Sequence, residues 1–217
     1  MARKRISQKP KETILVVTAT EAEALYFSQM RKDCRYSNMT VEWQEDFRNF
    51  HHLIGVVARK RTAGNFTSAW LVFGLTDLGL TVADVQSEME YAERRKVKLG
   101  WNNPSLPLWY LLHTQVPRGF VADPNAISAA LRKTFPTFSD DAAYLLADGN
   151  DLHLRLYSGK STAVVNAARY EENVGNTLGM RTSNMTALLN DITDICGLAN
   201  LSQTQQELGL KRKSGRL

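Results

Sequence analysis

The sequence contains little of what marks secreted, membrane-spanning or disordered proteins. Its 217 residues include only two cysteines, Cys34 and Cys196, and neither belongs to a CxxC motif, which excludes a disulfide framework and a four-cysteine zinc site. Six prolines and thirteen glycines are too few for a collagen-like or low-complexity chain. No apolar run approaches the roughly 18 residues that cross a bilayer, and residues 1–12 lack the apolar segment of a secretory signal. We therefore expect a globular, cytoplasmic protein that does not associate with membranes.

Several common catalytic motifs are also absent. The four histidines include no HExxH or HxxxH pair, which disfavours a zinc hydrolase. The chain has no GxxxxGKS/T and no GxGxxG motif, so nothing in it supports nucleotide hydrolysis or dinucleotide binding. It also lacks the GxSxG motif, which disfavours an acyl hydrolase.

Positive charge is concentrated at the two ends of the chain. Nine of the 27 Lys and Arg residues lie in residues 1–11 and 211–217, which contain no acid, so the body between them is mildly acidic. Two further basic clusters lie within the body, at 59–61 and 94–96. Such segments bind nucleic-acid phosphates, although short basic termini can serve only to keep a protein soluble. The candidate nucleic-acid-binding residues are Arg3, Lys4, Arg5, Arg59, Lys60, Arg61, Lys211, Arg212 and Lys213.

Apolar runs alternate with helical patterns through the first half of the chain. Residues 13–18 (TILVVT) and 69–73 (AWLVF) have the continuous apolar character of strands that are buried on both faces of a parallel sheet. Residues 39–43 and 97–101 predict two further strands, and the segments between the strands have the composition and apolar spacing of helices. The alternation predicts an α/β fold with a parallel sheet flanked by helices, in which strands 13–18 and 69–73 are neighbours.

The chain from about residue 120 predicts a mostly helical C-terminal half. Helices are expected at 126–133, at 152–168 and from 185 to 195. Before them, Ser105 is expected to cap an apolar helix in which Trp109 and Leu112 are core residues. We expect residues 12–200 to form a single domain between a basic N-terminal arm (1–11) and a basic C-terminal tail (201–217).

Ligands of open α/β sheets bind at the carboxyl ends of the strands, which draws attention to the loops at 18–23 (TATEAE) and 74–77 (GLTD). Their acids Glu21, Glu23 and Asp77 are candidate catalytic residues. The two glutamates also suit the positive first turn of a helix capped by Thr20, and Asp77 suits a turn, without any catalytic role. His113 is a further candidate, although a histidine also suits the negative end of an apolar helix.

Three segments of the chain resemble the RloB-like family, whose members are relatives of Toprim nucleases associated with bacterial phage-defence and abortive-infection loci. These segments are ILVVTATEAEALYF, AWLVFGLTD and GWNNPSLPLWYLLHT, and RTSNM follows late in the chain. The most specific piece is NNPSLPLWYLLH, because its order of residues is not a generic helix pattern. The resemblance runs from about residue 12 to 195. It implies a Toprim/Rossmann-like fold, with nucleic acid or an ATPase encoded by a neighbouring gene as the partner.

Most acidic positions of the family pattern carry no acid in this chain. Alignment through Tyr26-Phe27 and Val72-Phe73 keeps Glu23 and Asp77, and the positions that have lost their acid are Thr18, Thr20, Gly74, Thr76 and Pro107. Toprim chemistry needs Mg²⁺ held mostly by carboxylates, so these replacements remove the charge that would make the ion bind. The resemblance therefore implies a site that holds no metal and needs no cofactor.

The sequence supports three interpretations of function. In the first, the chain is an RloB-like defence protein that has lost catalysis and acts by binding nucleic acid or a partner ATPase. In the second, Glu21, Glu23 and Asp77 hold Mg²⁺ at shifted positions in an active nuclease. In the third, the chain is a binding protein that shares only the fold. Glu21 and Glu23 are about 200° apart around a helix axis, so at most one of them can lie beside Asp77, which disfavours the second interpretation.

Overall fold

The computed structural model describes residues 11–175 and 179–197, and four of their segments form one parallel sheet. The strands are β1 (Ile14–Thr18), β2 (Met39–Trp43), β3 (Ser68–Gly74) and β4 (Lys98–Asn102). Their order across the sheet is β2-β1-β3-β4, and every neighbouring pair is parallel. β1 therefore pairs directly with β3, with Thr18 opposite Val72, and this confirms the predicted adjacency.

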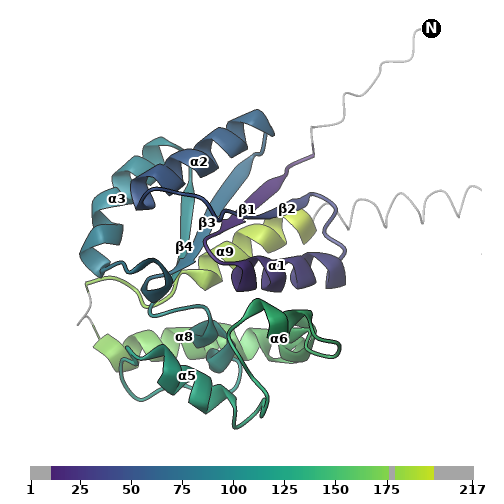
Figure 1. Cartoon of the computed structure of the whole chain (residues 1–217), viewed down its shortest axis with the longest axis vertical. Helices are drawn as coiled ribbons and strands as arrows, with labels where there is room; N and C mark the ends of the chain where they lie inside the picture. Colours follow the sequence, from purple (N-terminus) through teal and green to yellow (C-terminus); the bar gives the residue numbers. More distant parts are fainter. Residues whose placement is uncertain (1–10, 176–178, 198–217) are drawn as a thin grey trace, which may run out of the picture.

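Helices cover both faces of the sheet (Figure 1). Ile14 and Val16 pack on one face with α1 (Glu21–Asp33) and α9 (Met185–Ile192). Leu15 and Val17 point to the other face, where α2 (Phe50–Ala63) and α3 (Val82–Arg94) cover them. Because both faces are covered, β1 and β3 are buried along their whole length, and their central residues are apolar. The predicted α/β sheet with flanking helices is confirmed.

Side-chain caps determine where the helices that follow β1 and β3 begin. At the start of α1, the Thr20 hydroxyl accepts the Glu23 N–H and the Glu23 carboxyl group accepts the Thr20 N–H. Thr81 and Asp84 form the same reciprocal arrangement at the start of α3. These bonds satisfy N–H groups that have no partner within the helix. The prediction of Thr20 as a cap is confirmed, and α1 begins directly after the β1 loop.

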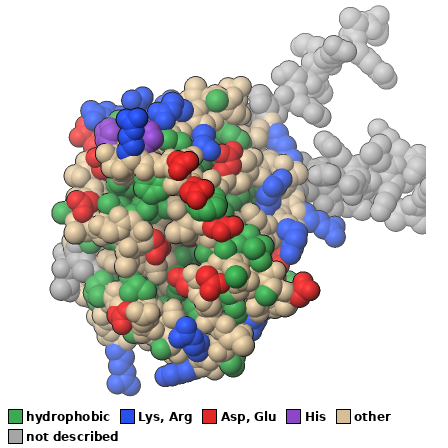
Figure 2. Space-filling view, in the orientation of Figure 1, with side chains coloured by type: hydrophobic (Ala, Val, Ile, Leu, Met, Phe, Trp, Pro, Cys, Tyr) green, Lys and Arg blue, Asp and Glu red, His purple; other side chains and the backbone are tan. Residues whose placement is uncertain are grey.

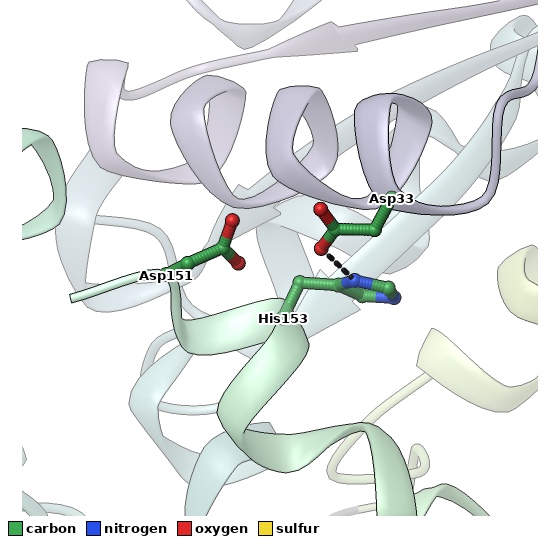
Figure 3. A group of neighbouring side chains, drawn as sticks. All are labelled: Asp33, Asp151 and His153. Atoms are coloured by element: carbon green, nitrogen blue, oxygen red, sulfur yellow. Dashed lines mark hydrogen bonds and ion pairs between the residues drawn. The ribbon is translucent and has the colours of Figure 1, made fainter. Parts of the chain in front are cut away.

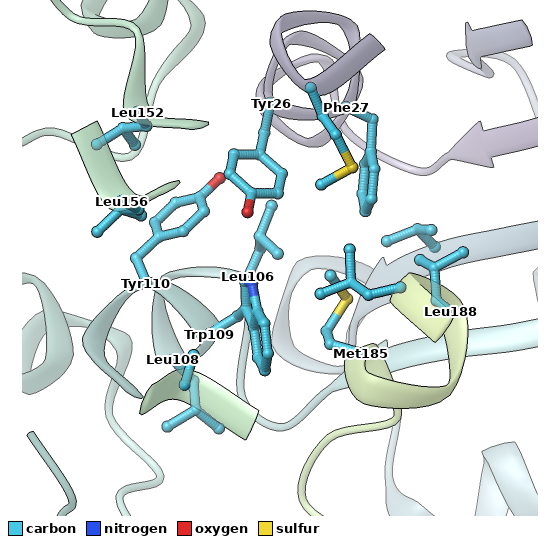
Figure 4. Close-up of a cluster of buried hydrophobic side chains, with 14 of the residues drawn as sticks. Tyr26, Phe27, Leu106, Leu108, Trp109, Tyr110, Leu152, Leu156, Met185 and Leu188 are labelled. Atoms are coloured by element: carbon cyan, nitrogen blue, oxygen red, sulfur yellow. The ribbon is translucent and has the colours of Figure 1, made fainter. Parts of the chain in front are cut away.

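The C-terminal half is helical, as predicted. Its helices before α9 are α4 (Pro107–Leu112), α5 (Pro124–Leu131), α6 (Ala142–Leu146), α7 (Leu152–Leu156) and α8 (Lys160–Val174). Every residue of α4 is buried, and Figure 4 shows Trp109 and Tyr110 among side chains from α1, α7 and α9. α4 thus joins the helical half to the α1 face of the sheet. Within the described ranges, no helix is both long and apolar enough to cross a membrane.

Two local details differ from the sequence-based predictions. Residues 152–168 do not form one helix, because a 3-10 turn at Tyr157–Gly159 separates α7 from α8. Gly159 lies close to α4 there, since a Cβ at this position would come within 3.2 Å of the His113 carbonyl oxygen. Ser105 does not cap α4, whose N-cap is Leu106, and the Ser105 hydroxyl has no protein partner.

We expect Trp109→Ala to lower the free energy of unfolding by about 3–5 kcal/mol, because the fully buried indole would leave a cavity beneath α1 and α9. Urea denaturation measures the change. Leu154→Ala is the control, since this side chain is 62% exposed and its removal should cost less than about 0.5 kcal/mol. Equal effects of the two substitutions would show that α4 is not a core helix.

Candidate functional site

The loops that follow β1, β3 and β4 meet at the carboxyl edge of the sheet. The Ala19 N–H donates to the Val72 carbonyl at 3.0 Å, and the Leu75 N–H donates to the Asn102 carbonyl at 3.0 Å. These backbone bonds bring the loops at 18–23 and 74–77 together. This is the edge at which open α/β sheets bind ligands.

Of the two glutamates in the first loop, only Glu23 is buried at this edge. Glu21 is exposed on α1, whereas Glu23 is 1% exposed. Glu23 Oε2 accepts the N–H groups of Ala19 and Thr20 at 3.2 and 3.0 Å, and Oε1 has no hydrogen-bond partner within the described part of the chain. Burial, together with the charge of Asp77, raises the pKa of Glu23 to about 8. The carboxyl group is therefore mostly protonated at neutral pH and acts as a neutral cap of α1.

The Asp77 carboxylate occupies the space beside Gly74. A Cβ at residue 74 would collide with Asp77 Oδ2 and would lie 2.8 Å from the Ser105 Cα. Shielding from water raises the pKa of Asp77 to about 6, while the outer side of the residue remains exposed. Asp77 thus fills the space of the side chain that is missing at position 74, and one carboxyl group remains at this edge.

The structure brings polar groups to this region that the sequence analysis missed. Asn102 is fully buried at the end of β4; its Oδ1 accepts the Ser183 hydroxyl at 2.9 Å, whereas its Nδ2 has no protein partner. Asp140, in the loop before α6, has its pKa raised by partial shielding from water and by the charge of Asp77, while the outer side of the residue remains exposed. Asp140 comes from the helical half, so no local spacing could connect it with Asp77. Buried polar atoms without protein partners, here also the Ser105 hydroxyl, are places where water or a ligand binds.

The other motif positions have local structural roles. The Thr18 hydroxyl donates to the Thr20 carbonyl at 2.9 Å, Thr76 begins a 3-10 turn at Thr76–Leu78, and Pro107 is the first residue of α4. The candidate His113 is a core residue, whose Nδ1 donates to the Trp109 carbonyl at 2.9 Å. Burial lowers the pKa of His113 to about 4, so the imidazole is neutral at physiological pH.

These residues do not fit the magnesium site of a Toprim nuclease. Mg²⁺ needs several hard oxygen ligands, usually including carboxylates. Thr18, Gly74 and Thr76 supply no carboxylate, and one oxygen of the neutral Glu23 already accepts two backbone N–H groups. Within the described residues, three His, Cys, Asp or Glu side chains come close enough to share an ion in one place, where the far end of α1 meets α7.

A second candidate site, which we call the basic groove, lies between the last turns of α2 and α3. Its volume is about 690 Å³, and no acid lines it. The lining residues are Gly55, Ala58, Arg59, Arg61, Thr62, Ala63, Tyr91, Arg94, Arg95 and Lys96. The structure thus joins two basic clusters that the sequence left separate. Figure 2 shows Lys and Arg side chains gathered over α2 and α3 at the top of the view.

Few cations of the basic groove form ion pairs with other described residues. Arg94 forms an exposed ion pair with Glu90 at 3.5 Å, and the Arg95 guanidinium lies 5.2 Å from the centre of the Tyr91 ring. Arg61 Nε is buried and has no hydrogen-bond partner among the residues that the structure describes. Lys60 instead pairs with Glu42 at 2.6 Å, outside the groove. Six further candidates lie outside the described residues, namely Arg3, Lys4, Arg5, Lys211, Arg212 and Lys213.

Glu23→Gln should change how stability depends on pH, because glutamine keeps an acceptor oxygen but cannot ionise. The pKa of Glu23 is about 8 when folded and near 4.5 when unfolded, so its stabilising contribution is complete below pH 4.5 and is lost as the pH rises toward 8. We expect urea denaturation to show that the variant gains stability relative to wild type between pH 5 and 8. Glu21→Gln, at an exposed position, should show no such gain. A difference in the free energy of unfolding between wild type and Glu23→Gln that stays constant from pH 5 to 8 would contradict the prediction.

Comparison with known proteins agrees with the pattern of motifs. The family model described as RloB-like protein matches residues 14–195, which include the whole sheet, the basic groove and α4. Neither the curated proteins nor the solved structures contain a significant match. The family match covers most of the sequence and contains every motif on which the resemblance rested. The chain belongs to the RloB-like protein family.

Proposed function

We propose that the chain binds nucleic acid through the basic groove without cleaving it, as a catalytically degenerate relative of Toprim nucleases in a bacterial defence system of the abortive-infection type. Family membership supports the defence role, and the missing acids at the carboxyl edge support the loss of cleavage. The observation that carries the proposal is that Arg59, Arg61, Arg94, Arg95 and Lys96 converge in one groove.

The positive charge of the basic groove exceeds the amount that would offset the negative carboxyl ends of α2 and α3. The carboxyl end of a helix carries about half a negative charge, so the ends of α2 and α3 together offset about one of the five cations. Glu90 offsets part of another. An excess of about three positive charges remains, and such an excess binds phosphates with release of counterions from the nucleic acid. The Tyr91 ring beneath Arg95 limits the freedom of this guanidinium before any ligand arrives.

The basic groove and the degenerate site lie at opposite edges of the sheet. The groove is formed by the helix ends that precede β3 and β4, whereas Glu23 and Asp77 follow the carboxyl ends of β1 and β3. A nucleic acid in the groove is therefore not held against the remaining acids. This separation supports a binding role that does not depend on cleavage.

Nucleic-acid affinity should fall with salt and should depend on the groove. Fluorescence anisotropy with labelled single-stranded DNA, duplex DNA and RNA measures the dissociation constant between 50 and 200 mM salt. Each lost phosphate contact should reduce the slope of log K against log salt by about 0.7–0.9. We expect Arg59→Gln/Arg95→Gln to weaken binding and to reduce this slope by the amount that corresponds to about two lost phosphate contacts.

The matched control for that measurement is Arg118→Gln/Lys133→Gln. Both residues are exposed in the helical half, and the double substitution changes the net charge by the same amount. Equal losses of nucleic-acid affinity in the two double variants would show that the overall charge, and not the groove, determines binding. Absence of binding to all three nucleic acids would reject the proposal in favour of the other partner that the family resemblance implies, an ATPase encoded nearby.

We expect no cleavage of DNA or RNA by the isolated protein in the presence of Mg²⁺ or Mn²⁺, because Glu23 is neutral and Asp77 alone is a weak ligand set. A nuclease assay on single- and double-stranded substrates tests this. One observation favours the alternative of an active nuclease, namely the Asp77 carboxylate in the space beside Gly74. Cleavage that disappears in both Asp77→Ala and Glu23→Ala would establish that alternative.

A further inference from the structure

Three metal-ligating side chains gather where the end of α1 meets the start of α7, away from the carboxyl edge and the basic groove. Asp33 ends α1, Asp151 is the N-cap of α7, and His153 lies in the first turn of α7. One ligand atom of each residue lies within 4.8 Å of the other two. Figure 3 shows the Asp33 carboxylate beside the His153 ring, with Oδ2 and Nδ1 2.8 Å apart, and the Asp151 carboxylate next to them.

The surrounding structure holds these ligands in place. Asp151 Oδ1 accepts the Leu154 N–H at 3.0 Å, which orients the carboxylate and leaves Oδ2 directed at the cluster. His153 is buried against the rings of Tyr26 and Tyr157. The Asp33 and Asp151 side chains are only 14% and 20% exposed. Groups that are already ordered lose little conformational entropy when they bind an ion.

The Lys32 ammonium lies on the open side of the cluster. Lys32 Nζ is 2.7 Å from Asp151 Oδ2 and 3.6 Å from Asp33 Oδ1, but the side chain is 69% exposed. A lysine ammonium is strongly hydrated and is carried on a flexible stem, so it returns to water readily. One ammonium leaves the two carboxylates with an uncompensated negative charge. A divalent cation would compensate both.

We propose that Asp33, Asp151 and His153 bind a divalent transition-metal ion such as Zn²⁺, which displaces the Lys32 ammonium and replaces the hydrogen bond between His153 Nδ1 and Asp33, so that the neutral imidazole carries its proton on Nε2. Three protein ligands and one water complete the four-coordinate shell that Zn²⁺ prefers. At bond lengths of about 2.1 Å, the ligand atoms of a tetrahedral ion lie about 3.4 Å apart, so side-chain rotations must bring this cluster slightly closer together. The imidazole selects Zn²⁺ over Mg²⁺, which prefers oxygen ligands alone.

A bound ion would fasten α7 to α1, and through α1 the helical half to the sheet. The hydrogen bond of 3.2 Å from Gln29 Nε2 on α1 to the Leu145 carbonyl of α6 already joins the same two parts of the molecule. An ion that binds only the folded chain stabilises it by mass action. The expected effect of the ion is therefore to stabilise the contact between the helical half and the sheet.

Isothermal titration of the untagged full chain with Zn²⁺, with Mg²⁺ as the comparison, tests the proposal. We expect one equivalent of Zn²⁺ to bind and to raise the melting temperature, and Mg²⁺ to do neither. Asp151→Ser keeps a capping oxygen for α7 but removes a ligand, so the affinity should fall more than about tenfold. Lys32→Gln removes the competing ammonium, so Zn²⁺ should bind several-fold more tightly. If the cluster is only an ion-pair network, neither wild type nor Lys32→Gln will bind Zn²⁺.

Asp141→Ser is the matched control, because it replaces the N-cap of α6 in the same way outside the cluster and should bind Zn²⁺ like wild type. Asp33→Asn is the second ligand variant and should also weaken binding, which keeps the test decisive if Asp151→Ser fails to fold. Cys34 follows Asp33 directly, so the absorption spectrum of the Co²⁺-loaded protein is recorded as well. A thiolate-to-cobalt band, undiminished affinity in Asp151→Ser, or weaker binding in Lys32→Gln would each overturn the assignment.

Discussion

The parallel pairing of β1 with β3 is the constraint on which the rest of the structure depends. It places two fully buried, mostly apolar strands at the centre of the sheet, so both faces must be covered by helices. It also brings the loops after these strands to one edge, with Glu23 and Asp77 close enough to affect each other electrostatically. The helices on the second face, α2 and α3, then end at the opposite edge. The basic groove between those ends is a consequence of the same topology.

The sequence was sufficient for the features that depend on local chemistry. Strands β1 and β3 could be predicted because burial on both faces leaves a continuous apolar run in the sequence. The cap at Thr20 could be predicted because a cap depends on residues that are neighbours in the chain. The break at Tyr157–Gly159 could not be predicted from the composition of residues 152–168, and Gly159 lies there in a tertiary contact with the end of α4. The prediction that Ser105 caps α4 was wrong for a similar reason, because the turn into α4 follows from tertiary packing.

For the candidate sites, too, the sequence was sufficient for features that depend on local chemistry and not for those that depend on tertiary packing. The loops with Glu23 and Asp77 follow from the rule for parallel sheets, and the helical angle between Glu21 and Glu23 indicated that only one of them faces inward. Folding brings Asp140 near enough to Asp77 for its charge to act on Asp140, and it places Arg59 and Arg95 in the same groove. Both results depend on contacts between distant parts of the chain. The sequence indicated the charges but not which of them share a surface. Lys60 illustrates this limit, because its position in a basic run did not reveal the ion pair with Glu42.

The electrostatics of the carboxyl edge agree with the proposal that it holds no metal. Several carboxylates at one edge repel each other unless a cation compensates them, and the effect is already visible here, because the charge of Asp77 helps to raise the pKa of Glu23. Acids at Thr18, Gly74 and Thr76 would add to that repulsion. With hydroxyl groups or no side chain at those positions, Glu23 can stay neutral and cap α1, while Asp77 occupies the space beside Gly74. In the proposed metal-free site, the lack of acids at these three positions thus also removes a repulsion that a cation would otherwise have to compensate.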